Sequence, residues 1–162
     1  FVGADLRQAD FSGMTVENVN LTDANLGWAN LEGTHFKGCT MRRANMSDAH
    51  LDRATFSAWT EMYGAKFTRA RLNGTDFERC ELGGTDFVGA TGERTTFTRC
   101  TLDQANFQSS TLTFGQFQNT SCHNTDFRHC NLEGSNMHKA DLETAYITPG
   151  VLAGTNGRPT WD

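Results

Sequence analysis

The sequence has only two prolines, few aromatic residues besides phenylalanine, and no long apolar run. Its mean hydropathy is −0.53, and its 162 residues include no apolar stretch of the roughly 20 residues that a membrane helix requires. No charged segment followed by an apolar run marks a secretion signal near the first residue. These absences predict no membrane association, and we expect one domain in the cytoplasm.

An excess of basic residues is also missing. Nineteen Asp and Glu outnumber fourteen Lys and Arg, which gives a formal net charge of −5. Residues 1–81 hold eleven acids and nine bases, and residues 82–162 hold eight and five, so the acid excess is mild and evenly spread along the chain. Direct nucleic-acid binding is not predicted, because it relies on Lys and Arg placed against phosphates.

Catalytic motifs are absent too. The sequence contains no glycine-rich phosphate loop, no HExxH helix and no GxSxG elbow. Asp and Glu are plentiful, but most Asp residues recur in one polar position of a repeat, where a short side chain is expected to bond the local backbone. We therefore predict no enzyme activity and no cofactor.

What the sequence does contain is a five-residue repeat over nearly its whole length. Residues 24–33 hold two copies, each with a small residue, an Asn, a large apolar residue and two small, polar or outward-facing residues. A period of five fits neither the 3.6-residue period of a helix nor the alternation of a strand. We infer a chain that turns a corner every five residues and points its small and large apolar residues inward.

The large apolar residues sort by type when every fourth one is compared. One series is mostly phenylalanine and another mostly leucine, which predicts a core made of Phe36, Phe56, Phe77, Phe97, Phe117, Leu31, Leu51, Leu72, Leu112 and Leu132. The sorting predicts four repeats, about twenty residues, per coil and roughly eight coils. It requires one inserted residue between Phe56 and Met62. Gly92 falls in the leucine series and is expected to leave a gap that Leu would fill.

The unit A(D/N)LXX resembles the pentapeptide-repeat family over about residues 1–154. The resemblance implies an all-β fold, a right-handed quadrilateral β-helix with short β-bridges on its faces. Some members bind DNA gyrase, a type II topoisomerase, by presenting an acidic rod that mimics DNA, and some of these confer quinolone resistance. The chain lacks the C-terminal helical cap and the long loops found among those members.

The two ends depart from the repeat in different ways. Residues 155–162 have turn residues and no period, so we expect an irregular cap or tail with Trp161 available to cover the last coil. The pattern is in register from Phe1, so the first coil is expected to present an open β edge. Such an edge favours end-to-end self-association.

Cysteine and histidine follow the repeat rather than a metal-site spacing. Four cysteines occupy the small inward position and Cys122 occupies a large one. All five are therefore expected to be reduced and to fill space in the core. The neighbouring pairs Cys122–His123 and His129–Cys130 are the best candidates for a zinc site, but the cysteines should point inward and the histidines outward. We predict neither a disulfide nor a metal site.

The inserted residue is the main irregularity of the rod. It should bulge the corner formed by residues 57–63 and place Trp59 and Tyr63 beside it. Trp28 and Phe114 also fall at outward positions. Exposed aromatic residues often anchor interfaces, so these four are the predicted partner-binding residues; the alternative is that each ring lies back on the rod.

Two functions fit the pattern. The first is a non-enzymatic protein-interaction rod, in its most specific form one that protects gyrase by DNA mimicry. The second is a structural spacer or scaffold module of a larger protein, with no partner on its faces. A continuous acidic stripe favours the first, and scattered charge favours the second.

Overall fold

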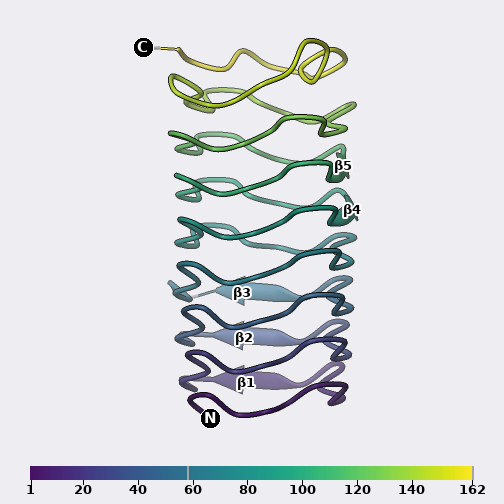
Figure 1. The fold of residues 1–162 in the computed structure, drawn as a ribbon, viewed down its shortest axis with the longest axis vertical. Helices are drawn as coiled ribbons and strands as arrows, with labels where there is room; N and C mark the ends of the chain where they lie inside the picture. The colour runs from purple at the N-terminus through teal and green to yellow at the C-terminus, as the bar shows by residue number, and fades with distance from the viewer. Residues whose placement is uncertain (58, 162) are drawn as a thin grey trace.

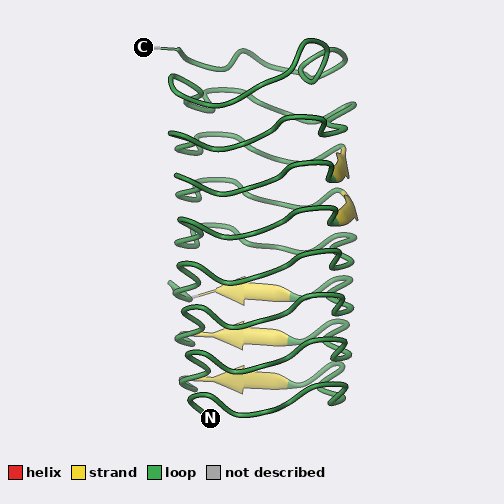
Figure 2. Ribbon diagram, viewed as in Figure 1, coloured by secondary structure: helices red, strands yellow, loops and turns green. Residues whose placement is uncertain are grey.

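The computed structural model describes residues 1–57 and 59–161, which form a stack of similar coils (Figure 1). Two short parallel sheets stand out in the stack (Figure 2). The first contains β1 (Thr15–Glu17), β2 (His35–Lys37) and β3 (Thr55–Ser57), and the second contains β4 (Thr91–Glu93) and β5 (Thr111–Thr113). Within the described residues no helix occurs, and none could therefore span a membrane.

Single parallel β-bridges connect the coils at four places per turn. Along one coil, Asn20, Asn25, Asn30 and His35 pair in order with the residues twenty positions later, Thr40, Asn45, His50 and Thr55. Four pairing positions per twenty residues make the coil four-sided. The predicted quadrilateral β-helix is therefore the observed architecture.

One coil is longer than its neighbours. His35 pairs with Thr55 twenty positions on, whereas Thr40 pairs with Glu61 and Thr55 with Asp76, both twenty-one positions on. The extra residue therefore lies between Thr55 and Glu61, inside the predicted interval. Ala58, which falls within the predicted bulge, lies outside the described residues.

Phenylalanines on two opposite sides fill the core. Rings one coil apart stack almost parallel, as in Phe77 and Phe97, whose centroids are 5.3 Å apart at 8°. Rings from opposite sides meet edge to face, as in Phe87 and Phe97, 5.6 Å apart at 87°. Both arrangements suit the ring quadrupole. All ten core residues named from the sequence are buried.

The small inward residue explains why Ala is so often replaced by Thr, Ser or Cys. The Thr75 hydroxyl donates to the Leu51 carbonyl at 2.8 Å, and the Thr95 hydroxyl donates to the Leu72 carbonyl at the same distance. The Cys100 thiol makes the same contact with the Phe77 carbonyl. No buried side-chain nitrogen or oxygen among the described residues lacks a partner. A buried hydroxyl is tolerated here because the repeat provides its acceptor.

Each corner has a left-handed residue and a side-chain cap. The last residue of most repeats has φ between +54° and +70°, a region that favours Gly, yet six arginines and Trp59 occupy it. The Asp or Asn before the large residue accepts the backbone N–H two positions on, as Asp86 does from Val88 at 2.9 Å. This is the local backbone role predicted for the Asp position.

Gly92 does not leave the gap that the sequence predicted. A Cβ built at this position would lie 2.3 Å from Thr95 Oγ1 and 3.0 Å from the Leu72 carbonyl oxygen. The hydroxyl of Thr95 and the adjacent backbone already fill the space. The expectation that Leu would be accepted at Gly92 is therefore wrong.

The two ends of the stack differ. At the C-terminal end, bridging continues beyond the last recognisable repeat, with Asn136 paired to Asn156 and Asp141 paired to Thr160. At the N-terminal end, large residues of the first coil are not fully covered and line a hollow of about 460 Å³; they include Phe1, Leu6, Phe11 and Val16. Trp161 is itself exposed.

Candidate functional site

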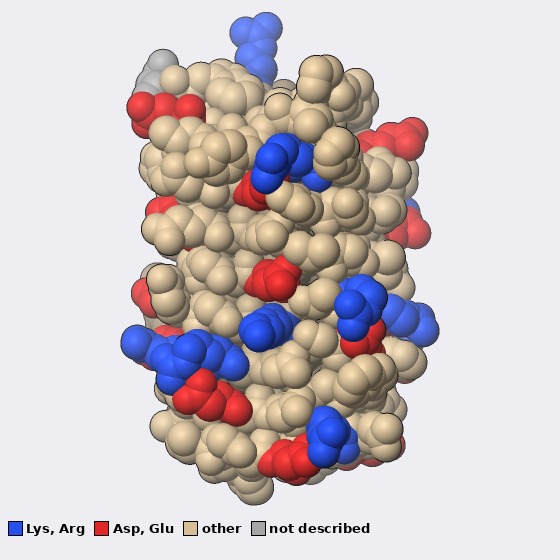
Figure 3. Space-filling model, in the orientation of Figure 1, with Lys and Arg blue, Asp and Glu red and all other residues tan. Residues whose placement is uncertain are grey.

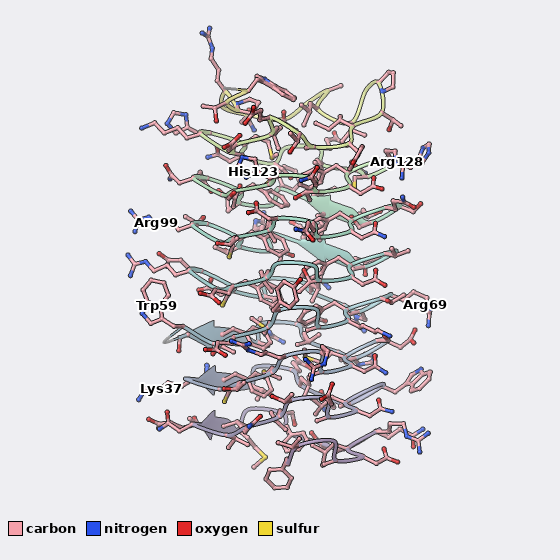
Figure 4. The ribbon with its side chains drawn as sticks, turned by 60° about the vertical axis from the view of Figure 1, so that its left-hand side comes forward. Lys37, Trp59, Arg69, Arg99, His123 and Arg128 are labelled. Carbon is pink, nitrogen blue, oxygen red and sulfur yellow. The ribbon has the colours of Figure 1, made fainter. Side chains whose placement is uncertain are left out.

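Trp59 lies at the corner made by the longer coil. Its side chain is 72% exposed, and its backbone has φ +61°, so it occupies the left-handed corner position. It borders a shallow hollow together with Phe56, Asp76, Glu78 and Arg79. Figure 4 shows Trp59 on the same edge of the rod as Lys37 and Arg99, away from Arg69 and Arg128.

Tyr63 turns back onto the rod. A Cβ built on Gly83 would lie 3.2 Å from Tyr63 Cδ2, and one built on Gly84 would lie 3.7 Å from Cζ. The ring therefore lies against two glycines of the next coil, with its outer surface exposed. The absence of side chains at Gly83 and Gly84 makes this contact possible.

Phe114 and Trp28 occupy other corners of the rod. Phe114 lies flat on Gly134, where an added Cβ would be 2.5 Å from the ring, and the Arg94 guanidinium lies 5.9 Å from the ring centroid. Trp28, in the second coil, borders a hollow with Asp5, Arg7 and Gln8 of the first coil. The structure therefore does not gather the four predicted aromatic residues into one patch: two rings, Tyr63 and Phe114, pack on glycines.

Acidic side chains gather on one side of the coil. We call it the acidic side; it is the side whose inward residues include Met62, Leu82, Leu102, Cys122 and Leu142. Bridges and backbone hydrogen bonds one coil apart place five carboxylates along it. These are Glu61, Glu81, Asp103, Asp141 and Glu143.

The Lys and Arg residues of this side lie only in its N-terminal part, which is the lower part of the rod in Figure 1. Arg42 pairs with Glu61 at 2.9 Å and Arg43 pairs with Asp23 at 2.7 Å. Above them, among the described residues, no Lys or Arg forms an ion pair with Glu81, Asp103, Asp141 or Glu143, and the cationic candidate is His123. The upper half of the acidic side is therefore strongly anionic.

Elsewhere, acids and bases are interleaved. Arg69 pairs with Asp48 and Arg71 with Asp52 across neighbouring coils. The Arg128 guanidinium, hydrogen-bonded to Asp126, lowers the pKa of that carboxyl to about 2. Figure 3 shows this mixture of blue and red on one face of the rod. The side that carries β1–β3 has the largest share of bases, Lys37, Arg79, Arg99 and Lys139, but Lys37 pairs with Glu17, and Arg79 and Arg99 lie within ion-pair distance of Glu78.

The charge is therefore uneven around the axis although it is even along the chain. The chain visits each side once every twenty residues, so counting along the sequence averages the four sides. An acid excess that is evenly spread along the chain is therefore not evenly spread around the rod. The signal was present in the sequence, since Glu61, Glu81, Asp103, Asp141 and Glu143 recur in register once the insertion is counted.

The cysteines show no reactive or metal-binding geometry. All five are free and buried. Burial raises the pKa of Cys100 and Cys122 to about 12 and that of Cys130 to about 11. A thiol with such a pKa is neither a nucleophile nor a ready metal ligand at neutral pH. Cys122 points inward and His123 outward, so the zinc pairing that the sequence analysis rejected is not formed.

His123 instead approaches carboxylates from the coil above. One ligand atom from each of His123, Asp141 and Glu143 lies within 4.8 Å of the other two. The spacing of neighbours along the chain does not reveal this group, because these residues meet one coil apart.

The comparisons with known proteins agree with the architecture. A family model described as a pentapeptide repeat region matches residues 29–107, and a second, described as pentapeptide repeats (8 copies), matches residues 1–38 and 116–148. The chain belongs to the pentapeptide-repeat proteins. Its coils accordingly form the right-handed quadrilateral β-helix of that family. No curated protein gives a significant match.

Two solved structures of the plasmid-mediated fluoroquinolone resistance protein QnrB1, both of trypsin-treated variants, are similar in fold. One is 23% identical with a TM-score of 0.71 and covers 91% of this chain and 78% of its own. The other is 20% identical with a TM-score of 0.53 and covers 92% and 89%. At these identities the likeness of this pentapeptide-repeat chain to QnrB1 is one of fold.

Proposed function

We propose that this pentapeptide-repeat chain is a non-enzymatic protein-binding rod whose acidic side docks into a basic groove that otherwise holds DNA. The most specific candidate for the partner is DNA gyrase. The observation that carries the proposal is the row of carboxylates on the acidic side. Glu61, Glu81 and Asp103 lie on three successive coils, and Asp141 and Glu143 lie together two coils further on.

The spacing of these carboxylates supports mimicry of a nucleic acid. Adjacent coils of a β-helix lie about 4.8 Å apart, the ordinary inter-strand distance, so five carboxylates over five coils give about one charge per 4.8 Å. This density is of the same order as the one charge per about 3.4 Å of a single DNA strand. A rigid row of charges does not lose much conformational freedom on binding, so it can compete with DNA for Lys and Arg side chains. The fold likeness to a fluoroquinolone resistance protein makes gyrase the partner to test first.

The alternative is a structural spacer without a partner. The interleaved ion pairs on the other sides, such as Arg69 with Asp48 and Arg71 with Asp52, favour it, because they leave those sides nearly neutral. A spacer does not require one side to be anionic while the bases of the neighbouring side, such as Arg79 and Arg99, have an acidic partner in Glu78.

A gyrase supercoiling assay, run with and without a quinolone, tests the proposal. We expect the protein to change supercoiling, or to relieve quinolone inhibition, in a concentration-dependent and salt-sensitive manner. No effect on either reaction at saturating protein, together with no binding to gyrase, would leave the spacer as the better explanation.

A matched pair of charge reversals locates the surface. Glu81 and Glu133 are both exposed, and among the described residues neither has a basic partner, but Glu133 lies on the side opposite the acidic side. We expect Glu81→Lys to weaken gyrase binding several-fold and Glu133→Lys to leave it nearly unchanged. Equal effects of the two variants would indicate dependence on net charge alone and contradict a role for the acidic side.

A further inference from the structure

Three consecutive coils stack an acid, a histidine and an acid on the acidic side. The Gln104 N–H bonds the His123 carbonyl, and Ser121 pairs with Asp141, which sets His123 one coil above Asp103 and one coil below Glu143. His123 is labelled in the upper part of the rod in Figure 4. Its side chain is 38% exposed, so a small ion from solvent can reach it.

The hydrogen bonds below the ring place a proton on Nδ1. The Ser121 hydroxyl donates to Asp103 Oδ1 at 2.6 Å, and its oxygen lies 2.9 Å from His123 Nδ1. Because the hydroxyl proton is used toward Asp103, the Ser121 oxygen accepts from Nδ1–H. When the ring is neutral, the lone pair of Nε2 faces the coil above.

Two carboxylates converge on that lone pair. His123 Nε2 lies 3.2 Å from Asp141 Oδ2 and 3.9 Å from Glu143 Oε2. Asp141 is itself oriented, because its Oδ1 accepts the Glu143 N–H at 3.2 Å. Three acceptors that face one another repel unless a cation lies between them.

The distances match the edge of a metal coordination shell. Zinc binds histidine nitrogen and carboxylate oxygen at about 2.0–2.2 Å, and tetrahedral ligands at that bond length are about 3.4 Å from one another. The two separations from Nε2, 3.2 and 3.9 Å, lie on either side of this value. The Ser121 and Asp103 contacts to the other side of the ring are the outer-shell support that metal-binding histidines usually have.

Elsewhere in the rod, carboxylates that face a neighbouring coil form ion pairs with arginine. Arg69 pairs with Asp48 and Arg53 with Glu32 across adjacent coils. In the described part of the chain, Asp103, Asp141 and Glu143 have no such partner besides the imidazole. A bound dication would take the place that arginine has in the lower coils.

We propose that His123 Nε2, Asp141 and Glu143 bind a divalent first-row transition-metal cation, with Zn²⁺ as the representative ion. Asp103 and Ser121 are positioning residues. Three protein ligands leave room for water, and the imidazole selects against Mg²⁺ and Ca²⁺, which prefer oxygen ligands. The ion would join two coils and reduce the negative charge of the acidic side, independently of whether gyrase is the partner.

Isothermal titration of the untagged, chelator-treated protein with ZnCl₂ tests the site. We expect one ion per chain, at least tenfold weaker binding in His123→Gln and in Glu143→Gln, and no saturable binding of MgCl₂. His138→Gln is the matched control, because His138 is an outward histidine outside this group, and it should retain the wild-type affinity. Asp103→Asn should keep one site and weaken it about tenfold.

Thermal unfolding and Co²⁺ absorption give readouts that do not depend on titration heats. Zn²⁺ should raise the melting temperature of the wild type and of His138→Gln but not of Glu143→Gln, whose side chain is exposed and leaves the core intact. The proposal is overturned if millimolar Zn²⁺ gives no saturable binding, since a proton on Nε2 would then satisfy the carboxylates. Unchanged affinity in His123→Gln, or a thiolate band in the Co²⁺ spectrum, would overturn it as well.

Discussion

At the scale of single residues, two inward positions determine what each repeat contributes. The large position packs against its equivalents one coil above and below, and the small position accepts only what fits beneath a backbone carbonyl. Thr95 shows the second constraint, because its hydroxyl uses both the space and the carbonyl of Leu72. The effect of a substitution therefore depends on which position it changes.

Phe97→Ala should be among the most destabilising single changes. The ring is fully buried and stacks between Phe77 and Phe117, with centroids 5.3 and 4.9 Å away. Removing it loses transfer free energy and leaves a cavity, so we expect a loss of about 3–5 kcal/mol. Denaturant unfolding measures this change in the free energy of unfolding. A loss below about 1 kcal/mol would mean that neighbouring rings collapse into the space.

Gly92→Ala should also destabilise the protein, by about 1–3 kcal/mol, because the added methyl group overlaps Thr95 Oγ1. Gly27→Ala is the control: the nearest atom to a Cβ there is Asn25 Oδ1 at 3.2 Å, and the equivalent position of another repeat carries a side chain, Val88, beside the same kind of cap from Asp86. We expect Gly27→Ala to cost less than about half as much. Equal unfolding free energies for the two variants would contradict the packing described at Gly92.

The thiols should be unreactive in the folded protein. All five are buried, and burial raises the pKa of Cys100 and Cys122 to about 12. A thiol-specific chromogenic reagent should therefore label almost no cysteine in native protein at neutral pH and five after denaturation. Rapid labelling of one thiol before unfolding would show that its coil opens locally.

At the scale of the coil, the five-residue period was sufficient to predict the sides, the stacking order and the inserted residue. It predicted these because they depend on the identity of inward residues such as Phe56 and Met62. It did not predict the space at Gly92, which depends on the Thr95 rotamer, or the group around His123, which depends on outward side chains one coil apart. Sequence periodicity specifies which residues are neighbours but not how flexible side chains meet.

The longer coil offers a separate test at Trp59. The residue has φ +61° and an exposed ring, so Trp59→Gly should relieve left-handed strain and raise the unfolding free energy by up to about 1 kcal/mol, whereas Trp59→Ala should change it little. If this corner contacts a partner, both variants should lose affinity by a similar factor. If neither variant loses affinity, Trp59 is not part of the interface.

At the scale of the whole molecule, the rod has distinct sides and distinct ends. Its acidic side follows from positions about twenty residues apart, so the charge that a partner meets depends on the direction of approach. Its ends differ because the C-terminal residues continue the bridging to Thr160, whereas the first coil leaves Phe1, Leu6 and Phe11 partly uncovered. Stability in such a stack is a sum over neighbours, so an end with one neighbour is weaker.

The protection of backbone amides against hydrogen exchange should therefore increase from the N-terminal coil toward the middle of the rod. Within residues 1–162, the Leu6 amide bonds Asn25 in a coil that is covered on one side, whereas the Leu102 amide bonds Ser121 in a coil that is covered on both sides. We expect Leu6 to exchange by local opening and Leu102 only by opening of much of the rod. End-to-end self-association through the first coil would cover the apolar hollow and slow exchange at Leu6 as protein concentration rises. Protection at Leu6 equal to that at Leu102 at every concentration would contradict a weak N-terminal end, and protection that grows with concentration would support the predicted association.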